Sequence, residues 1–133
     1  MESVANSMGI EWTGIDGDSS VSKPSICLFD YTMGAYFPSE FDLVWCVEFV
    51  EHVEEKFVYN FLPSLSCGRV LLLTAAPPGH KGYHHVNCRP QRYWIDMIEA
   101  AGMSYDEEET KDLRAASTMK RDFVRKRGMV FVK

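Results

Sequence analysis

The sequence lacks any long apolar run. Of its 133 residues, 46% are hydrophobic and 25% are charged, which is the composition of an ordinary globular domain. No stretch approaches the ~18–20 consecutive apolar residues of a membrane-spanning helix. The first nine residues carry Glu2 and no basic cluster, unlike a secretory or organellar leader. We therefore expect one cytoplasmic domain over residues 1–133, with no membrane partner.

Cysteine is scarce and is not arranged in any metal-binding or redox motif. The four cysteines, at positions 27, 46, 67 and 88, are too far apart for a C-x-x-C pair, and each has apolar neighbours. We expect them to be reduced and mostly buried.

Positive charge is in deficit over the whole chain but not at its end. Fourteen basic and nineteen acidic residues give a net charge of −5, which argues against a protein that coats nucleic acid through bulk charge. Residues 111–133 nevertheless hold eight Lys and Arg against two Asp. This basic segment is either a solvated final hairpin or a contact for a phosphate-bearing partner.

Short apolar runs alternate with helical patterns along the chain. We expect strands at 10–15, 26–29, 41–47, 70–76, 103–105 and 128–132, and helices at 2–8, 51–62, 91–101 and 110–117. The acidic run 106–109 should face water. This order predicts an α/β fold with a mostly parallel sheet and an antiparallel C-terminal edge strand. Ligands of such sheets bind beyond the carboxyl ends of the strands.

Five motifs follow one another in an order that suggests a family. They are W-T-G-I-D-G-D (12–18), F-D-Y (29–31), F-D-L-V-W-C-V-E-F-V-E-H-V (41–53), G-R-V-L-L-L-T-A-A-P-P-G (68–79) and the G-x-H-H-V-N-C-x-P-x-x-Y-W-I block (82–95). The set resembles class I S-adenosylmethionine-dependent methyltransferases, especially short phage and marine environmental members. The resemblance implies a Rossmann-like methyltransferase sheet and S-adenosylmethionine as cofactor.

One family element has no counterpart in the sequence. The resemblance implies a first strand and a D-x-G-x-G loop, and residues 2–9 match only the end of the helix that follows them. Because that strand is central in the family, its loss would leave two strand edges unpaired, and relative to the family the chain is N-terminally truncated. We expect direct pairing of the flanking strands, a homodimer that supplies a strand, or a chain that is a fragment of a longer gene product.

The resemblance also implies a set of cofactor contacts. Asp16 would accept hydrogen bonds from the ribose hydroxyls, with Asp18 as an alternative, and Asp30 would receive the adenine amino group beside Tyr31. The remaining expected contacts are Gly17 and, under the adenosine and methionine portions, Cys46, Val47 and Glu48. The other interpretation of Asp16 and Asp30 is turn chemistry, since Asp is common where strands end.

A carboxylate and histidine group follows the third strand. Glu48, Glu51 and His52 have i, i+3, i+4 spacing, which places them on one side of a helix, and His84 or His85 could complete a divalent metal site. This E-x-x-E-H block resembles small-RNA 2′-O-methyltransferases and ubiquinone-pathway O-methyltransferases, for which a metal is implied. Without a metal, His52 or His85 could act as a general base. Alternatively, Glu51, Glu54 and Glu55 form a solvated helix face.

Our leading functional hypothesis is methyl transfer to an unidentified oxygen or nitrogen of a small molecule or nucleic acid. The rivals are a catalytically inactive, methyltransferase-like interaction module and a metal-dependent RNA 2′-O-methyltransferase. Tyr93 and Trp94 could stack on an acceptor, but their helical stripe favours core packing. Asn87 could bind substrate or hold its loop.

Overall fold

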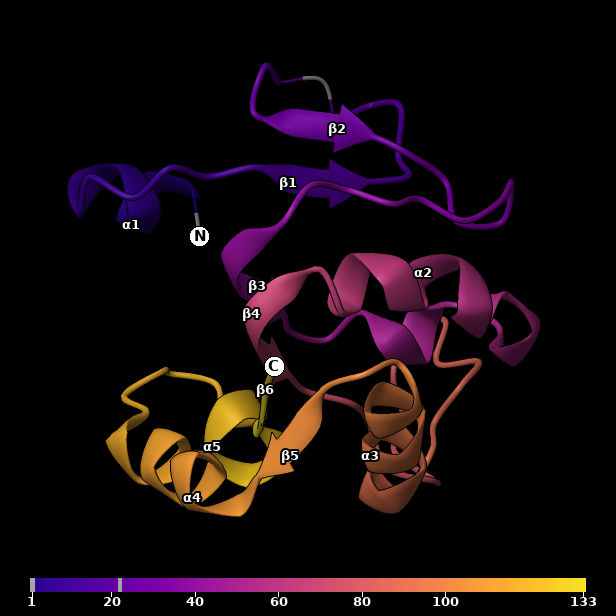
Figure 1. Cartoon of the computed structure of the whole chain (residues 1–133). Coiled ribbons are helices and arrows are strands. Elements are labelled where there is room, and N and C mark those ends of the chain that lie inside the picture. The colour runs from indigo at the N-terminus through magenta and orange to yellow at the C-terminus, as the bar shows by residue number, and fades with distance from the viewer. Residues whose placement is uncertain (1, 22) are drawn as a thin grey trace.

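Strands in two separate sheets form the framework of the molecule. The computed structural model describes residues 2–21 and 23–133. In the smaller sheet, β1 (Gly14–Asp16) pairs in parallel with β2 (Ile26–Leu28), after the short helix α1 (Glu2–Ser7) (Figure 1). A Cβ atom at Gly14 would lie 2.5 Å from Cδ1 of Ile26, so any larger residue would make this side chain shift. Of the expected strand at 10–15, only the last two residues are extended as β1.

The larger sheet has the strand order β3-β4-β6-β5. β3 (Phe41–Cys46) and β4 (Gly68–Leu73) are parallel, whereas β6 (Met129–Val132) is antiparallel both to β4 and to β5 (Ser104–Asp106). Three of its four strands thus run the same way. The chain is an α/β protein, as expected.

The prediction of an antiparallel C-terminal strand is confirmed in its direction and wrong in its position. β6 lies between β4 and β5, so β5 forms the edge. The physical reason is burial. Met129, Val130 and Phe131 are all buried, on both faces of the strand, and a strand covered on both faces belongs inside a sheet.

The two strands expected to flank a missing central strand do not pair with each other. In residues 2–21 and 23–133, β1 pairs with β2, and β3 pairs with β4. A cavity of about 200 Å³ lies between β1 and the start of β3 and is lined by Thr13, Ile15, Tyr36, Pro38, Ser39 and Phe41. Direct pairing is therefore wrong for the described chain, because this space separates the two edges.

Short 3₁₀ turns replace the first half of the helix expected at 51–62. The structure has η1 (Val50–His52), η2 (Glu55–Phe57) and then α2 (Val58–Leu65). Val53 and Glu54 interrupt the helix because both are extended, with ψ of 127° and 143°. The first residues of the apolar stripe expected at 51–62 therefore lie before α2 begins, in the 3₁₀ turns or between them.

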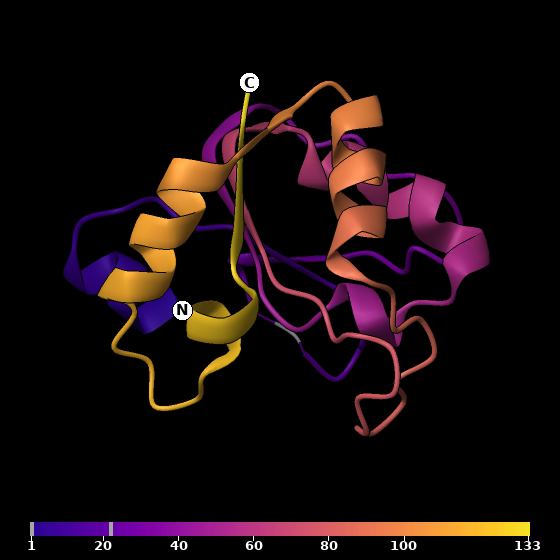
Figure 2. The ribbon, with the colours of Figure 1, turned by 90° about the horizontal axis from the view of Figure 1, so that it is seen from below.

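Helices cover both faces of the larger sheet. α3 (Gln91–Ala100) follows Pro90 and ends before Gly102, which has a φ of 92°. α4 (Glu107–Ala116) starts earlier than expected, because the Asp106 side chain accepts a hydrogen bond from the Glu109 amide at 2.9 Å. The acids at 107–109 are exposed to water, as expected, and they also form its first turn. α5 (Phe123–Arg127) was not predicted; Figure 2 shows α4 and α5 on the opposite side of the sheet from α2 and α3.

The core lies between the sheet, α2 and α3. Trp94, Phe61 and Phe131 are the largest fully buried side chains, and Leu71 and Leu73 of β4 pack with them. Core packing is thus confirmed for Trp94, and Tyr93 packs partly buried against the same cluster. On the opposite face, the Thr110 hydroxyl accepts a hydrogen bond from the Val130 amide at 2.8 Å.

Two expectations concern cysteine and membrane spans. All four cysteines are free thiols, with Cys46 and Cys67 buried and Cys27 and Cys88 half-buried. Among the described residues, no helix combines the length and the apolar character needed to cross a membrane.

Phe61→Ala should destabilise the protein strongly. Removing a fully buried aromatic side chain loses its transfer free energy and leaves a cavity, which costs about 3–5 kcal/mol of unfolding free energy. Urea denaturation followed by circular dichroism measures the change. Tyr59→Ala, on the same helix but 73% exposed, is the control and should change stability by less than about 1 kcal/mol. Equal losses in the two variants would contradict the core described here.

Candidate functional site

Acidic residues stand at the carboxyl ends of the two strands of the smaller sheet. Asp16 ends β1, and Asp30 follows β2 by two residues. The two ends are in contact, since a Cβ atom at Gly17 would lie 3.5 Å from Cα of Asp30. The structure thus brings together two of the residues predicted for the cofactor.

Each of these carboxylates holds a turn through one oxygen. Asp16 Oδ1 accepts from the Asp18 amide at 2.9 Å, and Asp30 Oδ1 accepts from the Thr32 amide at 2.8 Å. The latter bond lowers the pKa of the Asp30 carboxyl. The Thr32 side chain also interacts with the Asp30 carboxyl and lowers its pKa, whereas among the described residues no donor contacts Oδ2 of Asp16. Both carboxylates therefore hold turns, and Oδ2 of Asp16 is available to a ligand.

Aromatic rings connect the end of β2 with the end of β3. Tyr31, directly after Asp30, packs edge-on against Phe49 with 5.8 Å between ring centroids, and Phe61 lies against both rings. The Asn60 side-chain amide also donates to the Tyr31 carbonyl at 2.7 Å. These contacts bring the carboxyl end of β2 next to the carboxyl end of β3.

Glu48 follows β3 in a strained conformation and is held by partners distant in sequence. Its φ is 54°, which is unusual for a residue other than glycine. The Thr74 hydroxyl lies 2.9 Å from its amide nitrogen and 3.0 Å from Oε1, and the Arg127 guanidinium lies 3.3 Å from Oε2. This ion pair is largely shielded from solvent, since the two side chains are 18% and 16% exposed.

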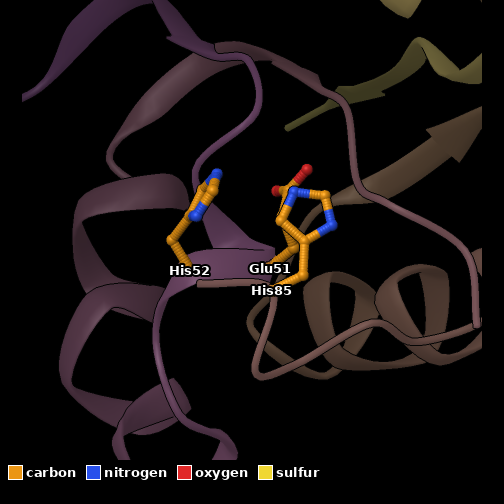
Figure 3. A group of neighbouring side chains, drawn as sticks. All are labelled: Glu51, His52 and His85. Carbon is orange, nitrogen blue, oxygen red and sulfur yellow. The ribbon is translucent and has the colours of Figure 1, made fainter. Parts of the chain in front are cut away.

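Glu51, His52 and His85 form the densest group of ionisable side chains in the site. One ligand atom from each lies within 4.8 Å of the others, and the two imidazole centroids are 4.9 Å apart. Figure 3 shows the three side chains projecting in the same direction from η1 and from the loop after β4. Two nitrogens and a carboxylate are a donor set that suits Zn²⁺, Mn²⁺ or Fe²⁺.

The Glu51 carboxyl group is fully buried without a hydrogen-bond partner. Neither Oε1 nor Oε2 has one in the part of the chain that the structure describes. Burial raises the pKa of this carboxyl and Glu48 raises it further, whereas the backbone amide of Glu51 itself, followed by His52 and His85, opposes the shift. A buried acid of this kind either keeps a proton or binds a cation.

Backbone hydrogen bonds fasten the histidine loop to η1. The amides of Val86 and Asn87 both donate to the Glu51 carbonyl, at 2.9 and 3.0 Å. His85 Nδ1 lies 3.1 Å from the His80 carbonyl oxygen, which orients the ring. Gly82 makes room for that ring, because a Cβ atom there would lie 2.2 Å from His85 Nε2.

The predicted ligand set is assembled only in part. Glu51, His52 and His85 come together, whereas the Glu48 carboxylate is paired with Arg127 and Thr74, and His84 is exposed outside the group. The expected single helix is not what joins them, since Glu48 lies before η1. Arg127 was missed because nothing local in the sequence indicates a partner 79 positions away. The buried Asn87 fits the expectation that it holds its loop.

Comparisons with known proteins do not assign the chain to a family. No family model matches it, and no curated protein is significantly similar in sequence.

Glu51→Gln should change how stability depends on pH in chelator-treated protein. Because folding raises the pKa of Glu51, its contribution to stability is complete at low pH and is lost as the pH rises above about 4.3, the ordinary glutamate value. The neutral amide has no such loss. We expect the unfolding free energy of the variant, relative to wild type, to increase from pH 5 to pH 8 in urea titrations. Glu54→Gln, at an exposed position, should follow wild type; a similar gain there would contradict the burial argument.

Proposed function

We propose that the chain is a methyltransferase-like domain that uses S-adenosylmethionine to methylate an oxygen or nitrogen of an acceptor. The observation that carries the proposal is that the ends of the parallel strands β1 and β2 meet the end of β3. Asp16, Asp30 and the residues after β3 lie on one side of the molecule, and the Glu51, His52 and His85 group adjoins them. Cofactors of α/β sheets bind beyond such ends. The order of motifs in the sequence suggests which cofactor.

The nucleoside half of the cofactor fits the donors and acceptors present. The carboxylates of Asp16 and Asp30 can accept from ribose hydroxyls and from the adenine amino group, and Gly17 lies against Asp30. Tyr31 supplies a ring next to Asp30. The segment Cys46 to Glu48 would form the floor, since Cys46 is buried at the end of β3. The sequence contains no glycine-rich turn for the methionine half.

When bound, S-adenosylmethionine supplies a methyl group on a sulfonium centre, and the protein contributes mainly position. Binding the acceptor in line with that methyl group turns an encounter into an intramolecular step. His52 and His85 can take a proton from an acceptor hydroxyl or amine.

A divalent metal is the second group that the site fits. Glu51, His52 and His85 would hold it, and the orphaned buried carboxyl of Glu51 is the observation that favours it. Such an ion would lower the pKa of an acceptor hydroxyl. A metal-dependent RNA 2′-O-methyltransferase is one form of this proposal.

The rival is an interaction module without catalysis. Leu28 of β2 and Leu43 of β3 are each more than half exposed, and apolar side chains on strands favour association. A homodimer could cover such side chains, and a strand that it adds between the sheets would lie beside β1 and β3. Cofactor binding distinguishes the two candidates.

S-adenosylhomocysteine should bind the wild-type chain in isothermal titration calorimetry. Hydrogen bonds to a carboxylate contribute about 1.5–3 kcal/mol, so Asp16→Asn and Asp30→Asn should each raise Kd roughly 10- to 100-fold. Asp42→Asn is the matched control, since Asp42 is exposed near the amino end of β3. Absence of heat and of a thermal shift with millimolar ligand would reject the cofactor proposal. Dimerisation in the same preparation would then support the interaction module.

His85→Ala should impair divalent metal binding, whereas His84→Ala should not. Changing residues that merely support metal ligands costs 10- to 100-fold in affinity, so removing a ligand should cost at least about tenfold. The measurement is a titration of chelator-treated protein with Zn²⁺ or Co²⁺, followed by calorimetry or cobalt absorbance. His84 is adjacent and exposed, outside the group. Equal effects of the two substitutions would show that the group does not bind the metal.

A further inference from the structure

A cavity with cationic walls lies beside the candidate site. Its volume is about 230 Å³, and its lining includes Arg89, Lys126 and Arg127 but no acidic residue. The remaining wall comes from the segment after β4, the start of α3 and the first residue of β6: Ala75, Pro77, Gln91 and Met129. A cavity lined by three cations and no acid suits an anionic group.

The direction of β6 explains why these cations meet at the site. Because β6 is antiparallel to β4, its first residue, Met129, lies opposite Leu73 at the carboxyl end of β4. α5 immediately precedes β6, so Lys126 and Arg127 are carried to that end. Arg89 arrives from the histidine loop on the other side of the cavity.

Two of the cations have only weak competing partners. Lys126 pairs with Asp122 at 2.6 Å and Arg89 pairs with Glu55, but all four side chains are at least 39% exposed. Exposed ion pairs contribute little to stability, so a ligand can compete for these cations. Arg127 keeps its shielded pair with Glu48, and in the described chain its Nη1 is buried without an acceptor.

Asn87 links the cavity to the Glu51, His52 and His85 group. Arg89 Nε donates to the Asn87 side-chain oxygen at 3.2 Å, and the Asn87 amide donates to the Glu51 carbonyl at 3.0 Å. A ligand anchored in the cavity could extend along this link toward the histidines.

We propose that this cavity binds a phosphate group carried by the methyl acceptor, held by Arg89, Lys126 and Arg127. The class of substrate is a phosphorylated compound, and this part of the inference rests on the proposed methyl transfer. Phosphate fits better than carboxylate, because two guanidinium groups and an ammonium group offer more donors and charge than a carboxylate uses. Lys126 and Arg127 belong to the basic segment 111–133, so the proposed phosphate would contact that segment through these two residues.

The test is a titration of the full chain with inorganic phosphate at constant ionic strength, followed by nuclear magnetic resonance of backbone amides and arginine side chains. We expect saturable shifts at millimolar phosphate around the cavity, and weaker binding of acetate. Lys126→Ala, and the double variant with Arg89→Ala, should weaken phosphate binding at least tenfold. Arg125→Ala, on the same helix but outside the cavity, should stay within twofold of wild type. Lys126→Ala alone provides the test if the double variant does not fold.

Several outcomes would overturn the inference: shifts that do not saturate, equal losses in the Arg125 and Lys126 variants, or acetate binding as tight as that of phosphate. Tighter binding of a short oligoribonucleotide that tracks Arg125 as well as Lys126 would indicate a general nucleic-acid surface instead. The separate titration with S-adenosylhomocysteine distinguishes the two proposals. Phosphate binding without cofactor binding would leave the anion site standing and reject methyl transfer, whereas cofactor binding without phosphate binding would reject only the anion site.

Discussion

The Glu51 carbonyl holds the candidate site together by accepting hydrogen bonds from two backbone amides. Val86 and Asn87 belong to a loop that follows β4, and η1 follows β3, so these two hydrogen bonds join the segments after neighbouring parallel strands. Without them, nothing in the secondary structure would keep His85 within 4.8 Å of Glu51 and His52. The sheet brings the two segments to the same edge, and the Glu51 carbonyl fixes the position of the histidine loop relative to η1.

This arrangement has energetic costs that packing alone does not explain. Glu51 is fully buried with an unpartnered carboxyl group, and Glu48 and His84 both have left-handed backbone conformations. Unsatisfied buried polar groups and strained non-glycine residues each cost on the order of 1–3 kcal/mol. A surface helix face of solvated acids would carry neither cost. The concentration of these features within one site favours the functional interpretation of E-x-x-E-H over the solvated-face interpretation.

Much of the fold could be predicted from local pattern, and much of the site could not. The apolar run 70–76 and the stripe of 91–101 identify β4 and α3 because burial imposes a regular spacing. The helix expected at 51–62 was divided because Val53 and Glu54 are extended, which the apolar stripe does not reveal. His85 was predicted as a general base and as a metal ligand, with the adjacent His84 as an alternative ligand. The choice between them depends on backbone hydrogen bonds and on the space above Gly82, which are tertiary properties.

The position of β6 determines the electrostatics of the site as well as the order of the sheet. As a parallel strand, β6 would deliver the end of α5 to the opposite edge, and Glu48 would lack its shielded partner. Glu48 would then have no cation beside it, and negative charges on Glu48 and Glu51 would repel each other. Such repulsion is the way in which Glu48 raises the pKa of Glu51. Arg127 pairs with Glu48 in the structure, and Glu51 is the acid that faces the two histidines. The inserted antiparallel strand therefore lets two neighbouring glutamates have different roles, one fixed in an ion pair and the other available to a proton or a metal.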